Sequence, residues 1–260
     1  MVAAIRERYQ RAQATIAAAA QAAGRQPDAV RLVVVTKSQP LSAVQAAIDA
    51  GARILGENYA EEAVGKMQAL QIRPNDPSSQ KIDMESARAT GMEVEWHMIG
   101  HVQGRKAQLA ARHFDLVHSV DSVRLAQRLD RFAEELEREL AVLLEFNVGG
   151  EGTKQGWAAS RPTEWPQLVQ DIETIAELHN LRIQGLMTMP PLTGRPEDAR
   201  DYFRRLRELR EFLAARLARI DWRELSMGTS ADYAVAVEEG ATLVRVGEAI
   251  LGPRSAQEAA

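Results

Sequence analysis

A lysine follows a strongly apolar segment in Arg31-Leu-Val-Val-Val-Thr-Lys37-Ser-Gln-Pro40. Four consecutive apolar residues, three of them β-branched, predict a strand that is buried on both faces. Pro40 predicts a turn directly afterwards, so Lys37 is expected where the buried strand ends. Burial favours the neutral amine of a lysine, and a neutral amine condenses with a carbonyl group to form a Schiff base. The alternative is a side chain that extends from the strand end into water.

Two later segments have the small residues that a phosphate site needs. Leu225-Ser-Met-Gly-Thr-Ser230 precedes a predicted helix, and Val246-Gly247-Glu248 follows the last predicted strand. Small residues let backbone N–H groups approach an anion, and a helix N-terminus favours negative charge. The alternative is a pair of tight turns in which Ser230 caps a helix. Asp232 would oppose a phosphate if its carboxylate pointed inward.

Arg245 lies in the last predicted strand, just before the second of these segments. An imine-forming lysine, a phosphate site and an arginine between them suggest pyridoxal 5′-phosphate (PLP) as the cofactor. Facing the pyridine nitrogen, an arginine only donates, so the nitrogen would stay unprotonated and the cofactor would be a weaker electron sink. If Arg245 is instead an interior salt-bridge partner, this inference disappears.

Extended and helical segments alternate along the chain. Helices are predicted at 1–24, 41–50, 59–70, 104–112, 121–140, 162–180, 196–220 and 231–239. Strands are predicted at 31–36, 53–58, 94–100, 115–119, 141–147, 181–187, 223–227 and 242–246. This alternation predicts parallel strands, and eight of them favour a closed (β/α)8 barrel of the TIM type over an open sheet. We expect one domain over residues 1–260, with the Pro-, Asn- and Ser-rich stretch 71–90 as a surface insertion.

The unusual polar residues fall at the predicted carboxyl ends of these strands, where barrels of this class carry their functional sites. Glu57, in Gly56-Glu57-Asn58, could orient a neighbouring group or cap the helix that follows, and capping is expected. His97 and His101 do not share a helical face, so no metal site is predicted. Arginines in 204–210 alternate with glutamates and predict a solvated helix face.

Composition excludes several classes of function. The chain has 260 residues, 45% of them apolar, and a net charge of −4, which gives no reason to expect nucleic acid or an anionic membrane as partner. The absence of cysteine excludes disulfides, thiolate nucleophiles and cysteine-based zinc sites, and fits a reducing compartment. No apolar run approaches the length of a membrane span, and residues 1–25 predict a helix of the fold rather than a transit peptide. The expected location is the cytoplasm.

Taken in order, these motifs resemble the pyridoxal phosphate homeostasis family (the YggS/PROSC proteins). The resemblance spans nearly the whole chain, and its motifs follow one another at compatible spacing. The matching segments are Val33–Ser38, Gly56–Asn58, Trp96–Gln103, Asn147 with Glu151, Lys154 and Gly156, Gly185–Met187, Leu225–Asp232, Val244–Gly247 and Ile250–Gly252.

The resemblance implies an alanine racemase-like barrel, a fold-type III PLP protein without the C-terminal β-domain. It implies that Lys37 carries PLP as a Schiff base, that Asn58 lies near the ring and that Arg245 faces the pyridine nitrogen. The positions that match the phosphate site are Ser226, Gly228, Ser230 and Gly247. Members of the family are thought to bind PLP and deliver it to apo PLP enzymes without catalysis.

The chain departs from the family pattern at two motif positions. Arg105 replaces a usual Asn, and Glu248 replaces a Thr that often contacts the phosphate; a carboxylate there is compatible only if it points away. Two alternatives stay open: a slow PLP-dependent amino-acid racemase or lyase, with His97 or Tyr59 as second acid, and a barrel for another phosphorylated ligand. Racemisation needs a proton donor on each face of the α-carbon, and Lys37 is the one evident base.

Overall fold

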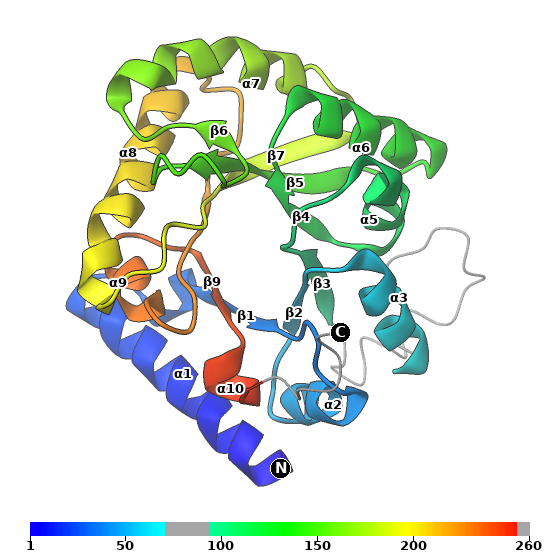
Figure 1. Cartoon of the computed structure of the whole chain (residues 1–260), viewed down its shortest axis with the longest axis vertical. Helices are drawn as coiled ribbons and strands as arrows, with labels where there is room; N and C mark the ends of the chain where they lie inside the picture. The colour runs from blue at the N-terminus through cyan, green and yellow to red at the C-terminus, as the bar shows by residue number, and fades with distance from the viewer. Residues whose placement is uncertain (71–93, 254–260) are drawn as a thin grey trace.

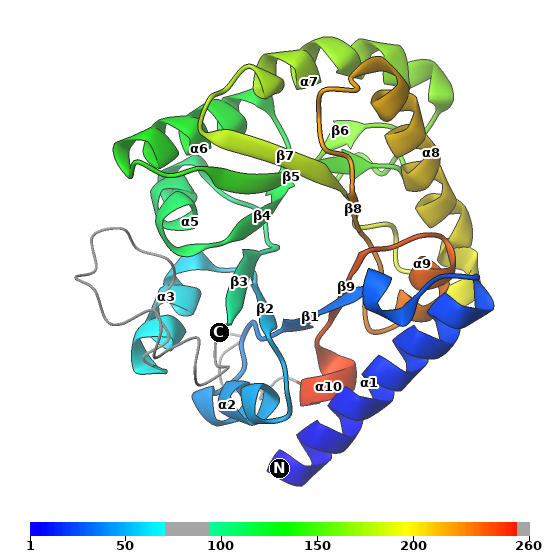
Figure 2. The same ribbon diagram turned by 180° about the vertical axis from the view of Figure 1, so that it is seen from behind.

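A ring of parallel strands, with helices around its outside, organises the computed structural model (Figures 1 and 2). The structure describes residues 1–70 and 94–253, so the predicted insertion at 71–90 lies outside the described residues. The strands are β1 (Arg31–Val35), β2 (Ile54–Glu57), β3 (Glu95–Met98), β4 (Leu116–Val120), β5 (Leu140–Asn147), β6 (Trp157–Ala158), β7 (Leu181–Met187), β8 (Glu224–Ser226) and β9 (Leu243–Val246).

Eight of these strands close the barrel in the order β1-β2-β3-β4-β5-β7-β8-β9, and β9 pairs with β1. Each of these pairings is parallel, and the short β6 adds to β5 beside the ring. The predicted (β/α)8 barrel is therefore confirmed. The eight barrel strands match the eight predicted ones, whereas β6 was not predicted because two residues carry no periodic signal.

The helices pack on the outer face of the ring. They are α1 (Val2–Ala22), α2 (Leu41–Asp49), α3 (Ala60–Ala69), α5 (Ala107–His113), α6 (Val123–Glu135), α7 (Leu168–Ala176), α8 (Arg200–Arg216), α9 (Tyr233–Glu238) and α10 (Glu248–Leu251). Short 3₁₀ helices occur at η1 (Pro27–Ala29), η2 (Gly104–Lys106), η3 (Pro162–Gln167) and η4 (Pro196–Ala199).

Several predicted helices are shorter than expected, and the one predicted over 104–112 begins as η2. α6 ends at Glu135, and Glu137 then adopts a left-handed conformation (φ 52°). Helices usually end this way at a glycine, so the end of α6 has no such signal in the sequence. The helix predicted from 162 begins as η3, because Pro166 lacks an N–H donor and its ring interferes with the preceding turn. The helix predicted over 196–220 begins as η4 and, as α8, ends at Arg216.

Two apolar layers result from the alternation of side chains along each strand. The larger layer lies between the strands and the helices. A smaller one fills the inside of the ring, and it consists of Val33, Ile54, Leu116, Leu143, Met187 and Leu243. Arg245 lies two residues beyond Leu243 and so points to the same side of β9, which puts a charged group inside the barrel towards the carboxyl ends of the strands.

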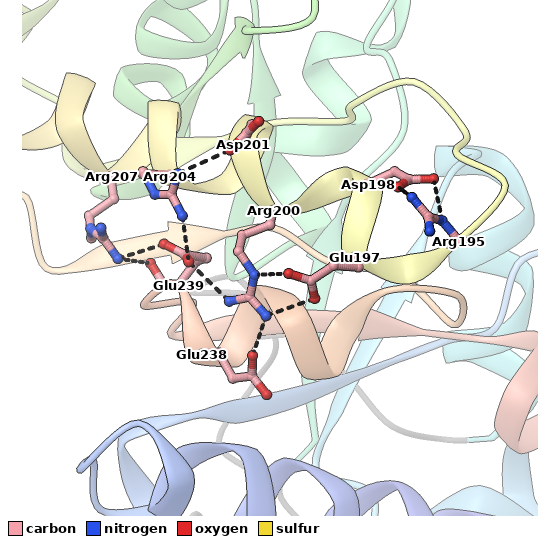
Figure 3. Close-up of polar contacts among 9 residues, drawn as sticks. All are labelled: Arg195, Glu197, Asp198, Arg200, Asp201, Arg204, Arg207, Glu238 and Glu239. Atoms are coloured by element: carbon pink, nitrogen blue, oxygen red, sulfur yellow. Dashed lines mark hydrogen bonds and ion pairs between the residues drawn. The ribbon is translucent and has the colours of Figure 1, made fainter.

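The charged face of α8 is only partly solvated. The side chain of Glu239 is 8% exposed and accepts hydrogen bonds from Arg200 (3.0 Å) and Arg207 (2.8 Å), with Arg204 at 3.7 Å (Figure 3). Arg200 also pairs with Glu238. The prediction of a solvated face is therefore wrong for Arg207, whereas Arg204 is exposed as predicted. Together with Arg200, these arginines tie α8 to the end of α9.

Candidate functional site at the rim of the barrel

Four neighbouring strands, in the order β2-β1-β9-β8, carry every predicted site residue. Residue pairing places Val35 beside Gly56 and Val34 beside Val246. The predicted residues lie at or just beyond the carboxyl ends of these strands: Asn58 after β2, Lys37 after β1, Arg245 and Gly247 on or after β9, and Ser226, Gly228 and Ser230 on or after β8. The fold thus brings them to one sector of the rim, while their contacts with a cofactor stay a prediction.

Lys37 stands two residues beyond β1, as expected, and is half-buried. The backbone N–H of Thr36 still bonds to Gly56 O at 2.9 Å, so the chain leaves the sheet only at Lys37. Ser38 then has φ 52°, a left-handed conformation that is rare for a residue other than glycine. The lysine therefore begins a tight turn directly above the barrel interior.

The two segments predicted to hold a phosphate are joined through Ser230. Its hydroxyl oxygen accepts hydrogen bonds from the N–H groups of Gly247 (3.2 Å) and Ala249 (3.3 Å). Ser230 therefore binds the beginning of α10, not the helix that directly follows it. A Cβ at Gly247 would lie 3.1 Å from Val35 O, so the absence of a side chain allows this segment to pack against β1.

The carboxylates near these segments are turned away or already bound. Asp232 Oδ1 accepts hydrogen bonds from the backbone N–H (2.6 Å) and the hydroxyl (3.1 Å) of Thr229. Glu248 is exposed. The hydroxyl proton of Ser230 therefore stays available to an anion, whereas the N–H groups of Gly247 and Ala249 already donate to Ser230 Oγ.

Arg245 is 3% exposed and its guanidinium is held on two sides. Nη1 donates to Ser226 Oγ (2.5 Å), and Nη2 donates to Thr188 O (2.9 Å) and to Met189 Sδ (2.8 Å). Burial lowers the pKa of Arg245 to about 10, while Glu145 and Asp232 act in the opposite direction, so the group stays a cation at pH 7. Within residues 1–70 and 94–253 the guanidinium of Arg245 forms no direct ion pair. The alternative that Arg245 is an interior salt-bridge partner is therefore wrong for this part of the chain.

A line of buried polar groups continues from Arg245 through the barrel. His118 Nδ1 lies 2.8 Å from Ser226 Oγ, and His118 Nε2 lies 3.0 Å from His97 Nδ1. Because a guanidinium only donates, Ser226 accepts from Arg245, and its own proton can then be donated to His118 Nδ1. His118 is then neutral with its proton on Nε2. Burial, followed by the charges of His97, Arg245 and Arg31, holds the pKa of His118 well below its usual range.

His97 continues this line away from the rim. Its Nε2 lies 3.3 Å from Glu95 Oε2, and both residues line a cavity of about 450 Å³ with Asp115, Arg223 and others from the amino ends of the strands. His97 thus faces the end of the barrel opposite Lys37. The hypothesis that His97 serves as a second catalytic acid is therefore wrong.

Glu145 is a buried titratable residue near Arg245 that the sequence analysis missed. It lies on β5, is 8% exposed, and has a pKa raised to about 7 by burial and by Asp121, against the opposing charges of Arg245 and Lys154. The available signal was a single carboxylate within the apolar run Ala141–Phe146. Such a residue changes charge near neutral pH beside the Arg245 cation.

A second cavity of about 570 Å³ lies beside this rim and is rich in basic groups. Its cationic lining includes Arg105, Arg124, Arg128 and Lys154. His101 also lines it and pairs with Asp121 at 3.1 Å, far from the buried position of His97. No helix in the described part of the chain is both long and apolar enough to cross a membrane.

The sequence pattern of the alanine racemase N-terminal domain matches residues 4–255. The parallel barrel with a lysine at the end of its first strand therefore belongs to this class of domain. Alanine racemase from Streptomyces coelicolor shares the fold at 20% identity, with a TM-score of 0.67 over 96% of this chain and 58% of that one.

Relatives of higher sequence identity show which family within this class the chain belongs to. The pyridoxal phosphate homeostasis protein of Pseudomonas aeruginosa is 40% identical over 250 residues, 96% of each chain, and that of Escherichia coli is 37% identical over 92% of each. PipY of Synechococcus elongatus, solved with PLP bound, is 33% identical with a TM-score of 0.73, over 91% of this chain and all of that one. The chain belongs to the pyridoxal phosphate homeostasis protein family.

Proposed function

We propose that this protein binds PLP through a Schiff base on Lys37 and serves PLP homeostasis without catalysing a reaction. The observation that carries this proposal is the convergence of Lys37, Arg245 and the Ser230–Gly247 contact on adjacent strands. The names of the relatives and the PLP-bound structure of PipY support it.

Each predicted residue has a role that its position allows. Lys37 Nζ would condense with the aldehyde of PLP, forming a C=N bond and releasing one water molecule. Ser230, Gly228 and Gly247 would hold the phosphate through hydroxyl and N–H groups, Arg245 would donate towards the ring nitrogen, and Asn58 would lie near the ring. Ser226 acts with Arg245, to which it is bonded at 2.5 Å.

A racemase is disfavoured because racemisation needs a proton donor on each face of the substrate carbon, and neither acid that the sequence offered, His97 or Tyr59, is placed to be the second donor. Tyr59 is the other candidate acid that the sequence offered, and it is 57% exposed at the start of α3, where solvent competes for its proton. Retention of an α-deuterium by a panel of amino acids is the expected result. Loss at about 1 per second or faster, the scale of ordinary enzymes, would favour the racemase alternative instead.

We further propose that apo PLP enzymes receive the cofactor, that the protein acts in the cytoplasm, and that residues 1–260 form one domain. The absence of cysteine supports a reducing location. The resemblance to proteins named for PLP homeostasis supports a transfer role.

Reconstitution with PLP tests the central proposal. The purified protein is expected to develop absorbance near 420 nm, roughly the position of a protein-bound imine of PLP. Borohydride reduction and peptide mapping are expected to place the adduct on Lys37. The Lys37→Ala variant is expected to lose both signals, whereas Lys106→Ala, at a side chain 43% exposed, is expected to keep them. An adduct found only on other lysines would overturn the assignment.

A further inference from the structure

A buried group of charged side chains lies behind the turn that carries Lys37. Lys66 of α3 is 6% exposed, and its Nζ lies 2.6 Å from Thr36 O, 2.7 Å from Glu57 Oε1 and 2.5 Å from Glu62 Oε1. An ammonium has three N–H donors, so each has an acceptor. The position of Lys66 is therefore fully specified by its contacts.

Both neighbours of Lys37 in the chain are bound by this group. Thr36 accepts from Lys66 through its carbonyl oxygen and donates from its hydroxyl to Glu57 Oε1 at 2.7 Å. Ser38 donates its backbone N–H to Glu62 Oε1 at 2.7 Å, and this bond holds it in its left-handed conformation. With both flanking residues anchored, the backbone has little freedom to redirect the side chain of Lys37.

Stability alone is a poor explanation for this arrangement. Glu57 is fully buried, does not cap α3 as the sequence suggested, and its Oε2 has no hydrogen-bond partner in the described part of the chain. Burial raises the pKa of Glu57, and Lys66 is the main opposing influence. Buried ion pairs add little net stability, and an unsatisfied carboxylate oxygen and a strained backbone both cost energy. Costs of this kind are typical of a functional site.

We propose that Lys66, Glu57 and Glu62 are positioning residues that hold Lys37 in the orientation from which it captures the cofactor aldehyde. This inference rests on the proposed function. It assigns a role in cofactor capture to side chains of β2 and α3 that are not among the predicted cofactor-binding residues.

Lys66→Met tests the inference, because it keeps the length of the side chain and removes all three donors. Glu57 is expected to take up a proton more readily in this variant, since burial raises its pKa and Lys66, the main opposing influence, is removed. Lys106→Met is the matched control, because Lys106 forms an exposed ion pair with Glu61, the residue before Glu62 on the same helix. We expect Lys66→Met to capture PLP about tenfold to a hundredfold more slowly than the unaltered protein, and Lys106→Met to capture it at the unaltered rate.

A second pair of variants separates positioning from stability. Lys66→Met combined with Glu57→Gln removes the buried acid that must otherwise stay protonated, and it is expected to recover melting temperature without recovering the capture rate. Glu62→Gln keeps the Lys66–Glu57 pair and is expected to speed hydrogen exchange at the Ser38 amide in the cofactor-free protein. A capture rate that follows the melting temperature across the set would overturn the inference.

Failure of the proposed function and failure of the positioning inference give different experimental results. Failure of the proposed function would appear as no adduct on Lys37 in the unaltered protein. Failure of the positioning inference would appear as an adduct on Lys37 that forms equally fast in Lys66→Met. The exchange rate of the Ser38 amide needs no cofactor, and an unchanged rate in Glu62→Gln would also count against the inference.

Discussion

Glu145→Gln is expected to make stability less dependent on pH. The pKa of Glu145 is raised from 4.5 to about 7 in the folded protein, chiefly by burial. Between these two values the folded state binds more protons than the unfolded state, so stability falls as pH rises through this window. The stability that protonated Glu145 contributes is fully present below pH 4.5 and is lost as pH rises through about 7. Glutamine keeps the shape of the protonated acid and does not titrate.

The size of the effect follows from the two proton-binding constants. At about 1.4 kcal/mol for each factor of ten, the difference between the two pKa values of Glu145 lowers the free energy of unfolding by about 3 kcal/mol at pH 8 and about 1 kcal/mol at pH 5. Glu145→Gln is therefore expected to exceed the unaltered protein in free energy of unfolding by these amounts. The side chain is 8% exposed, so solvent screens this cost only weakly.

Urea denaturation of the cofactor-free proteins at pH 5 and pH 8 measures the difference. Glu248→Gln is the control, because it removes an exposed carboxylate from the same rim and is expected to show no comparable change. If Glu145→Gln differs from the unaltered protein by the same amount at both pH values, Glu145 titrates alike in the folded and unfolded states. That result would refute the argument from burial.

Two further predictions concern the interior and the rim of the barrel. Long-range nitrogen-15 spectra of the cofactor-free protein are expected to show His118 neutral at pH 6 with its proton on Nε2, because burial holds its pKa well below 6.5; a charged ring, or a proton on Nδ1, would contradict the direction of the Arg245–Ser226–His118 line. Gly100→Ala is expected to lower the free energy of unfolding by about 1–3 kcal/mol, because its Cβ would lie 2.4 Å from Asn58 O. Gly65→Ala, inside α3 with nothing within 4 Å, is instead expected to raise it by about 0.5–1 kcal/mol; thermal denaturation compares the two, and equal melting temperatures would contradict the crowding at Gly100.

The sequence by itself determined the alternation of strands and helices and the placement of chemical groups along it. Apolar runs such as Leu32–Val35 predict buried strands from local pattern alone, and the polar residue that follows each run is already visible. The positions of Lys37 and Arg245 at or near strand ends could therefore be predicted from the sequence. Two-residue β6 and the left-handed end of α6 were not predictable, because each depends on contacts outside its own segment.

Only the tertiary structure decided which of these strand ends meet. Closure of the ring through β9 and β1 puts Gly247 beside the turn of Lys37, although about 210 residues separate them. The same closure joins His118 to Ser226 across 108 positions and buries Glu145 near Arg245. Contacts between distant strands depend on register and barrel closure, and pKa values depend on the burial that results. Neither the contacts between distant strands nor these pKa values can be predicted from a local pattern of residues.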